Sequence, residues 1–284
     1  MKALTKKVAL TITSVLLVLS LSLGLVACGG GSSSGGGSDE GELTVLKVGA
    51  SVTPHAEILA NVKDALAAEG FDLQIIEYTD YVKPNLDTDA GDTFANYFQH
   101  LPYLEDFNAE NGTDLISVAA VHFEPLGIYP GTTSTIESLQ DGATIAIPND
   151  TTNEARALIL LADQGLITLP ENADLTITPR DIIDNPKNLK FLEVDAAAVP
   201  RELVEVDLGV INGNNALAAD LDPLTVLAVE DVASAAAQTY ANILVVKSGS
   251  ESDPGIQALI KALTSEETRD FITDTYSGVV VPVF

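Results

Sequence analysis

The sequence predicts a two-lobed α/β protein with a ligand cleft between its lobes, and three observations lead to this prediction. First, apolar strand-like segments alternate with longer helical segments, a pattern typical of largely parallel sheets that helices cover on both faces. Second, the chain has 284 residues, which is too long for one such sheet. Third, the pattern restarts at residues 138–142, where a helix end leads into a new buried strand.

The first lobe is predicted to consist of residues 43–125, completed by a return segment at 240–284. Its first part has strand patterns at 43–48, 72–78 and 115–129, and helix patterns at 55–69, 82–86 and 93–110. The return segment has a strand pattern at 241–246 and two closing helices at 251–261 and 265–275.

The second lobe is predicted at residues 126–239. It has a strand pattern at 143–148, a helix at 151–164 and short strands at 191–194, 208–211 and 225–229. The chain is expected to cross between the lobes near 120–129 and 238–246. Ligands of such proteins bind between the lobes, at the carboxyl ends of the strands.

The first 28 residues have the features of a lipoprotein signal peptide. Three lysines precede an uncharged apolar run from 8 to 26, and Leu25–Cys28 resembles a lipobox, whose cysteine is lipidated before cleavage. Cys28 is the only cysteine, so an internal disulfide and a cysteine-rich metal site are excluded. An uncleaved membrane anchor is the alternative, because the run is almost long enough to span a bilayer. Both interpretations place the rest of the chain at the extracytoplasmic face of the cell membrane.

Residues 29–42 form a Gly/Ser-rich tether with a root-mean-square reach of roughly 20 Å. A tether suits a binding module that must stay near a partner in the membrane.

The chain carries 14 basic and 41 acidic side chains, a net charge of −27. Such a field repels nucleic acid and anionic lipid headgroups, so we expect no nucleic-acid partner and membrane attachment through the lipid alone.

Aromatic residues gather in the first lobe, with Tyr81, Tyr97, Phe98 and Tyr103 around His100. On a helix, successive residues turn by about 100°, so these side chains are expected to divide between the core and the cleft. One interpretation is core packing around a hydrogen-bonded histidine. The other is an aromatic slot for a flexible apolar side chain, such as a thioether.

A second group of candidates lies at residues 148–156, where a buried strand ends and a helix begins. Asp150 or Thr151 can cap the helix, whose first amides favour an anion. Arg156, one turn into the helix, can hold a carboxylate with two parallel hydrogen bonds. The alternative is a capped helix start with Arg156 paired to Glu154 or another nearby acid.

The segment Asn212–Asn215 follows a hydrophobic strand, and its amides can pair with both charges of a zwitterion. An Asn/Gly turn is the alternative.

His122 and Glu124 share one face of a strand and could bind a metal together with His100. We expect no metal site, because too few histidines and cysteines are available to complete one. Glu124 could instead face a ligand ammonium or stabilise the crossing strand.

Several stretches resemble the NlpA/MetQ family of methionine-binding lipoproteins, the substrate-binding components of methionine ABC importers. The resemblance runs from about Leu46 to Phe284, and its most specific segments are residues 98–104 and 185–190. It implies a type II periplasmic-binding fold and no enzymatic activity or cofactor. It also implies capture of L-methionine, a close analogue or a methionine-containing peptide, and delivery to a methionine ABC permease and its ATPase.

The resemblance assigns roles to individual residues. It implies that Tyr81, Phe98 and His100 surround the methionine side chain, with Tyr103 as a further wall. It also implies that the following residues bind the amino-acid head group: Arg156 at the α-carboxylate, with Asn153 and Asn212. Asn215 stands where the family usually has an aromatic residue, a difference that bears on which side chain is bound.

Two other functions fit the sequence less well. A binding protein for another amino acid and a metal-binding surface lipoprotein both remain open. A tethered enzyme is not expected, because the chain has no Gly-x-Ser-x-Gly motif, no metal motif and no thiol besides the lipidated one.

Overall fold

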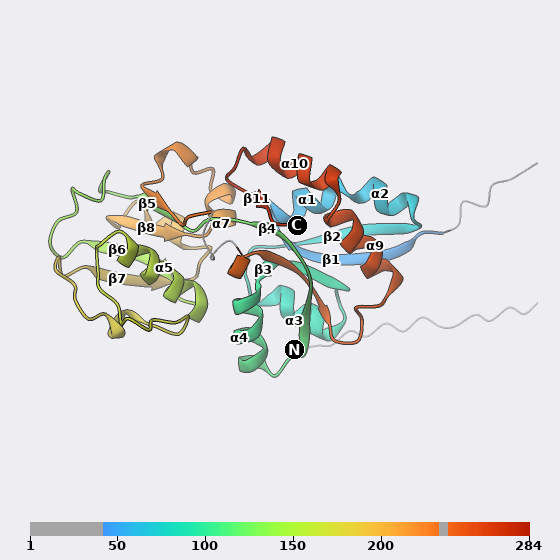
Figure 1. Ribbon diagram of the computed structural model, residues 1–284, viewed down its shortest axis with the longest axis horizontal. Coiled ribbons are helices and arrows are strands. Elements are labelled where there is room, and N and C mark those ends of the chain that lie inside the picture. The colour runs from blue at the N-terminus through green and yellow to red at the C-terminus, as the bar shows by residue number, and fades with distance from the viewer. Residues whose placement is uncertain (1–41, 233–237) are drawn as a thin grey trace, which may run out of the picture. The chain divides into compact units, whose positions relative to one another are not determined.

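The computed structural model describes residues 42–232 and 238–284 of the chain. The predicted signal peptide, the lipidation site Cys28 and all of the predicted tether except Glu42 lie outside the described residues. Within the described part, no helix is both long enough and apolar enough to cross a bilayer. Two β-sheets organise this part of the chain, and each sheet with its covering helices is called a lobe below (Figure 1).

The first lobe is built on a six-stranded sheet with the strand order β11-β4-β10-β3-β1-β2. Its strands are β1 (Thr44–Ser51), β2 (Phe71–Tyr78), β3 (Ala95–His100), β4 (Leu115–Phe123), β10 (Asn242–Lys247) and β11 (Val281–Pro282). Strand β1 pairs in parallel with β2 and β3, whereas β10 lies antiparallel between β3 and β4. The segment that returns from the second lobe therefore supplies an interior strand of the first sheet.

Helices cover both faces of this sheet (Figure 1). One face carries α1 (His55–Asn61), α2 (Lys63–Ala68), α9 (Pro254–Leu263) and α10 (Glu266–Tyr276), and the other carries α3 (Lys83–Ala90) and α4 (Leu101–Asn111). In α9, for example, Asp253 caps the helix by accepting the N–H of Gly255 at 2.7 Å. Ile256, Leu259 and Leu263 then repeat at helical spacing and are buried in the core.

The second lobe is built on a five-stranded sheet with the order β7-β6-β8-β5-β9. Its strands are β5 (Gly127–Pro130), β6 (Thr144–Pro148), β7 (Lys190–Val194), β8 (Leu208–Ile211) and β9 (Ala228–Val229), and its α-helices are α5 (Thr151–Asp163), α6 (Val199–Glu202) and α7 (Gly213–Ala218). Two short 3-10 helices are η1 (Pro179–Asp181) and η2 (Pro223–Thr225). Ile145 and Ile147 pack with Leu158 of α5, whereas Ala146 packs with Val199 of α6. This alternation places helices on both faces.

Two segments connect the lobes. The first joins β4 to β5 through Glu124–Leu126, and the second joins β9 to β10 through 230–241, of which 233–237 lie outside the described part. The segments are hydrogen-bonded to each other. The main-chain N–H of Glu230 donates to the carbonyl of Leu126 at 3.0 Å, and the N–H of Leu126 donates to the Glu230 carboxylate at 2.9 Å.

The predicted helix at 93–110 is wrong in its first half, where the chain forms β3 and α4 begins only at Leu101. Every residue of β3 is buried, because the strand lies inside a sheet that helices cover on both faces. It therefore lacks the polar and apolar alternation by which a sequence reveals a half-buried strand.

Three other expectations need correction. The predicted strand at 115–129 is two strands in different sheets, because Pro125, which lacks an N–H, lies in the connection between them. The predicted helix at 55–69 is divided at Val62 into α1 and α2. Both sheets are mixed, because β5 and β10 run antiparallel to their neighbours.

Candidate functional site

A cavity lies where the two lobes and the first crossing segment meet. Its walls include every binding residue predicted from the sequence: Tyr81, Phe98, His100, Tyr103, Asn153, Arg156 and Asn212. Glu124 and the segment Gly213–Asn214, which the sequence offered as possible ligand contacts, also line the cavity. Gln99 and Asn242 are lining residues that the sequence did not single out.

The first lobe contributes an aromatic wall. Because β3 is a strand, Phe98 and His100 point to one face of the sheet, while Tyr97 points to the other and is fully buried. The ring of Phe98 lies 5.9 Å from that of Tyr81 and 6.0 Å from that of Tyr103, and the last two rings are 6.0 Å apart. These spacings are typical of mutually packed aromatic rings.

His100 joins this wall to the second lobe. It is the N-cap of α4, and its Nδ1 accepts the N–H of Tyr103 at 3.2 Å. The proton therefore lies on Nε2, which is 3.3 Å from Oδ1 of Asn153. Burial, reinforced by the charge of Arg156, lowers the pKa of His100 to about 3, so the ring is neutral at pH 7.

Two asparagines of the second lobe lie beside each other. Asp150 caps α5 and fixes Asn153 by accepting its main-chain N–H at 3.1 Å and its side-chain N–H at 2.8 Å. Asn153 Oδ1 in turn accepts Nδ2–H of Asn212 at 2.8 Å. Asn212 is the N-cap residue of α7 but makes no side-chain capping bond. Its Oδ1 is buried and has no hydrogen-bond partner among the described residues.

Arg156 is buried and connects the second lobe to both crossing segments. Its Nε and Nη2 donate to the Glu230 carboxylate at 2.6 and 2.5 Å, and Nη2 also donates to the main-chain carbonyl of Glu124 at 3.1 Å. The guanidinium carbon lies 4.2 Å from the ring centre of Tyr240. The ionic partner of Arg156 is therefore Glu230, far away in the sequence, and not Glu154. Nη1 takes part in none of these bonds.

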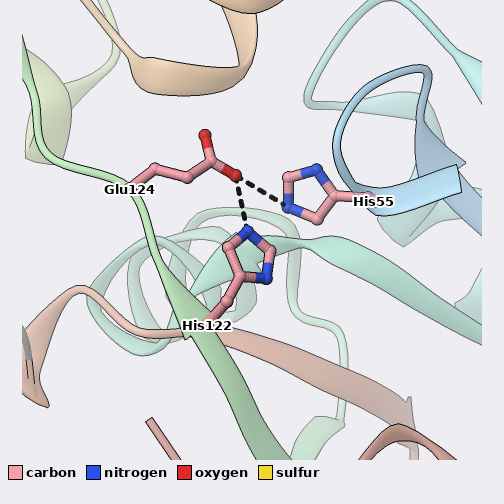
Figure 2. Close-up of side chains that lie close together, drawn as sticks. All are labelled: His55, His122 and Glu124. Atoms are coloured by element: carbon pink, nitrogen blue, oxygen red, sulfur yellow. Dashed lines mark hydrogen bonds and ion pairs between the residues drawn. The ribbon is translucent and has the colours of Figure 1, made fainter. Parts of the chain in front are cut away.

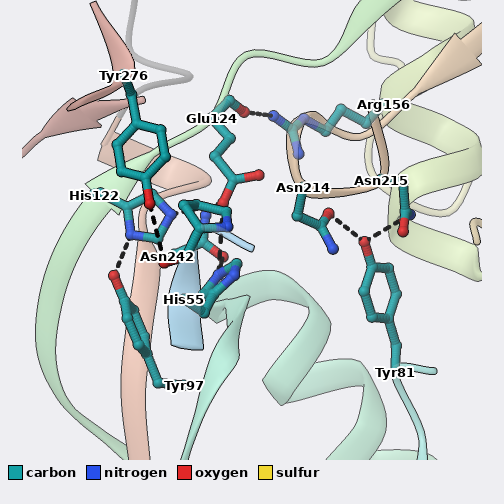
Figure 3. Close-up of polar contacts among 11 residues, drawn as sticks. His55, Tyr81, Tyr97, His122, Glu124, Arg156, Asn214, Asn215, Asn242 and Tyr276 are labelled. Carbon is teal, nitrogen blue, oxygen red and sulfur yellow. Dashed lines mark hydrogen bonds and ion pairs between the residues drawn. The ribbon is translucent and has the colours of Figure 1, made fainter. Parts of the chain in front are cut away.

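Glu124, which lines the cavity, forms a buried cluster with His55 and His122 (Figure 2). His122 Nε2–H donates to Oε1 of Glu124 at 2.6 Å, and Nε2 of His55 lies 3.6 Å from the same oxygen. His55 Nε2 also bonds Oδ1 of Asn242 at 2.9 Å, and the Tyr97 hydroxyl contacts Nδ1 of His122 (Figure 3).

This cluster differs from the grouping considered in the sequence. His100 is not part of it and bonds Asn153 instead, while His55 takes the third place. Burial lowers the pKa of His55 to about 4 and that of His122 to about 3, and it raises the pKa of Glu124. Both nitrogens that approach Glu124 face one carboxylate oxygen, so the described contacts are those of a hydrogen-bonded network that fixes this carboxylate.

Comparisons with known proteins agree with this architecture. A model of the family described as NlpA lipoprotein matches residues 46–284. The methionine-binding lipoprotein MetQ of Bacillus subtilis is 39% identical over 91% of this chain and 93% of its own length.

Solved structures are similar over the same region. A Ruminococcus gnavus protein described as a lipoprotein has a TM-score of 0.83 at 49% identity, covering 85% of this chain and 100% of its own. A nutrient-binding protein from Burkholderia cenocepacia, bound to methionine, has a TM-score of 0.79 at 39% identity, covering 84% of this chain and 100% of its own. These likenesses confirm the predicted two-lobed periplasmic-binding fold. The chain belongs to the NlpA lipoprotein family.

Proposed function

We propose that this chain is a lipid-anchored, extracytoplasmic solute-binding protein that captures L-methionine and delivers it to the permease and ATPase of a methionine ABC importer. A relative named as a methionine-binding lipoprotein and a similar structure bound to methionine support the ligand. The chemistry of the cavity supports it independently, because the walls offer partners for both charges and for the side chain of an amino acid.

The observation that carries the proposal is the buried Oδ1 of Asn212. An unsatisfied buried acceptor is costly, by roughly 1–3 kcal/mol, and native proteins seldom keep one. The oxygen belongs to a residue that lines the cavity, so an N–H of a bound ligand can satisfy it. An α-ammonium group has three such donors.

The charged groups of the cavity suit the rest of the head group. Nη1 of Arg156 can donate to the α-carboxylate while Nε and Nη2 stay bonded to Glu230. The Glu124 carboxylate, held by His122, can face the ammonium. Burying a zwitterion requires that both charges be paired, and this site offers a partner of each sign.

The aromatic wall suits an apolar, flexible tail. Tyr81, Phe98 and Tyr103 present ring faces and edges, and the neutral imidazole of His100 adds no charge. A thioether gains roughly 0.3–1.5 kcal/mol from each favourable contact with an aromatic ring. Closure of the lobes over the ligand would present one defined conformation to the importer.

Calorimetry on the purified protein tests this proposal. L-Methionine should bind and give the largest thermal stabilisation among the twenty amino acids, because a bound ligand stabilises by mass action. Asn212→Ala should weaken binding at least 10-fold, since the exchange leaves ligand and protein groups unpaired. Asn185→Ala is the matched control, because the Asn185 side chain bonds the main chain of Leu189 in a turn and is not among the residues that line the cavity. Unchanged affinity in Asn212→Ala, or a larger stabilisation by another amino acid, would contradict it.

A further inference from the structure

Tyr81 connects the two lobes through its hydroxyl group (Figure 3). The residue lies in the loop after β2, in the first lobe. Its OH donates to Oδ1 of Asn214 at 2.6 Å and accepts Nδ2–H of Asn215 at 3.0 Å. Both asparagines belong to α7 in the second lobe. One phenol therefore joins the lobes through two hydrogen bonds.

These bonds lie at a boundary between two spaces. Tyr81 and Asn214 line the ligand cavity and also an outer groove between the lobes. Asn215 lines the outer groove only. The Tyr81 ring and the two amides thus form a wall that separates the cavity from the groove.

Both sides of this wall are held firmly within their own lobes. The loop of Tyr81 is fixed by Asp80, which accepts the N–H of Lys83 at 2.7 Å, and by Tyr103, whose OH donates to the Tyr81 carbonyl at 2.8 Å. On the other side, Ala216 of helix α7 packs in one buried cluster of the second lobe with Val199 and Ile211. The hydroxyl can reach both amides only while the lobes keep this arrangement.

We propose that Tyr81, Asn214 and Asn215 form an interlobe latch over the ligand cavity, and that Asn215 is a positioning residue that sets the rate of ligand release. The inference deepens the proposed function and rests on it for the identity of the ligand. Opening the lobes breaks both hydrogen bonds, whereas association of the ligand with open lobes needs neither. The latch therefore acts on release and hardly on capture.

The rate at which radiolabelled L-methionine dissociates in the presence of excess unlabelled ligand tests the latch. A neutral hydrogen bond contributes a net of roughly 0.5–1.5 kcal/mol, so Asn215→Ala should speed release about 2- to 13-fold with an unchanged association rate. Asn215 does not line the cavity, so a lost ligand contact cannot cause this effect. Tyr81→Phe keeps the ring and should speed release at least as much.

A double variant and a control separate the latch from general damage. In Tyr81→Phe/Asn215→Ala, release should be no faster than in Tyr81→Phe alone, because both changes remove the same bond. Tyr78→Phe is the control, since Tyr78 lines the same groove but its hydroxyl donates to Asp87 within the first lobe, at 2.5 Å. Unchanged release in Asn215→Ala, additive effects in the double variant, or equally fast release in Tyr78→Phe would overturn the proposal.

A measurement without ligand keeps this test distinct from that of the proposed function. Spin labels at Glu105→Cys in the first lobe and Glu171→Cys in the second, with Cys28→Ser, report the separation of the lobes. Asn215→Ala should shift the distances toward longer values relative to the labelled parent, and Tyr78→Phe should not. An identical distance distribution in Asn215→Ala refutes the latch whatever the ligand is. Failure of the parent to bind methionine refutes only the proposed function.

Discussion

The buried histidine of the ligand cavity makes a sharp prediction about acid stability. His100 has a pKa of about 3 in the folded protein against 6.5 for the ordinary side chain. A pKa that folding lowers contributes stability that is complete above pH 6.5 and is lost as pH falls toward 3. The unfolded chain takes up a proton at this position, and the folded protein excludes it.

The size of the effect follows from the difference between the two pKa values. Each pH unit below 6.5 costs the folded state about 1.4 kcal/mol through this one residue. At pH 5 the loss is roughly 2 kcal/mol, a large part of the 5–15 kcal/mol that stabilises a typical protein.

His100→Asn isolates this contribution. Asparagine is a good N-cap residue, so its Oδ1 can replace Nδ1 as the acceptor for the N–H of Tyr103, but it does not titrate. Urea unfolding of both proteins at pH 7.5, 6.5, 5.5 and 5.0 gives their free energies of unfolding. The free energy of unfolding of the variant, relative to that of the parent, should rise by roughly 2 kcal/mol between pH 7.5 and pH 5.0.

The two proteins are compared at each pH because other groups also titrate and affect both of them equally. Glu154, for example, has its pKa raised by burial to about 7, which gives an opposite trend in both proteins. A difference that stays constant from pH 7.5 to 5.0 would refute the reasoning, since it would mean that His100 binds a proton equally well in both states.

Three further predictions test the core, the cavity and a second titrating group. Leu158→Ala, at a fully buried position of α5, should lower the free energy of unfolding by about 2–5 kcal/mol in urea titrations. Gly213→Ala should displace the side chain of Glu124, whose Oε2 would lie 2.9 Å from the new Cβ, and calorimetry should show at least 10-fold weaker methionine binding. The stability that Glu154 contributes through its raised pKa is complete below pH 4.5 and is lost as pH rises through about 7. From pH 5 to pH 8, the melting temperature of Glu154→Gln should therefore rise relative to that of the parent protein.

Segments with a clear local pattern could be predicted from the sequence. Strand β8 occupies the predicted residues 208–211, and α5 begins at the predicted Thr151 because Asp150 caps it. The interior strand β3 could not be predicted, because burial on both faces removes the alternation that marks a strand. The expected division of the aromatic side chains between core and cleft is observed, but it comes from the two faces of a strand: Tyr97 lies in the core, whereas Phe98 and His100 line the cavity.

The residues of the cavity likewise divide into those that a local motif predicts and those that it does not. Residues in dense local motifs, such as Phe98, Asn153 and Asn212, were predicted and do line it. Glu230 and Asn242 lie on or next to the second crossing segment, where no neighbouring residue marks them. Their positions depend on how two distant segments pair in space, which a local pattern does not contain.

The position of β10 between β3 and β4 has a consequence for the order in which the molecule can be completed. Residues 242–247 are synthesised long after β3 and β4. Until then, these two strands lack the strand that pairs with both of them. The first lobe cannot close its sheet until the second lobe has been synthesised. The native sheet of the first lobe therefore depends on nearly the whole chain being available, because its interior strand is drawn from residues close to the C-terminus.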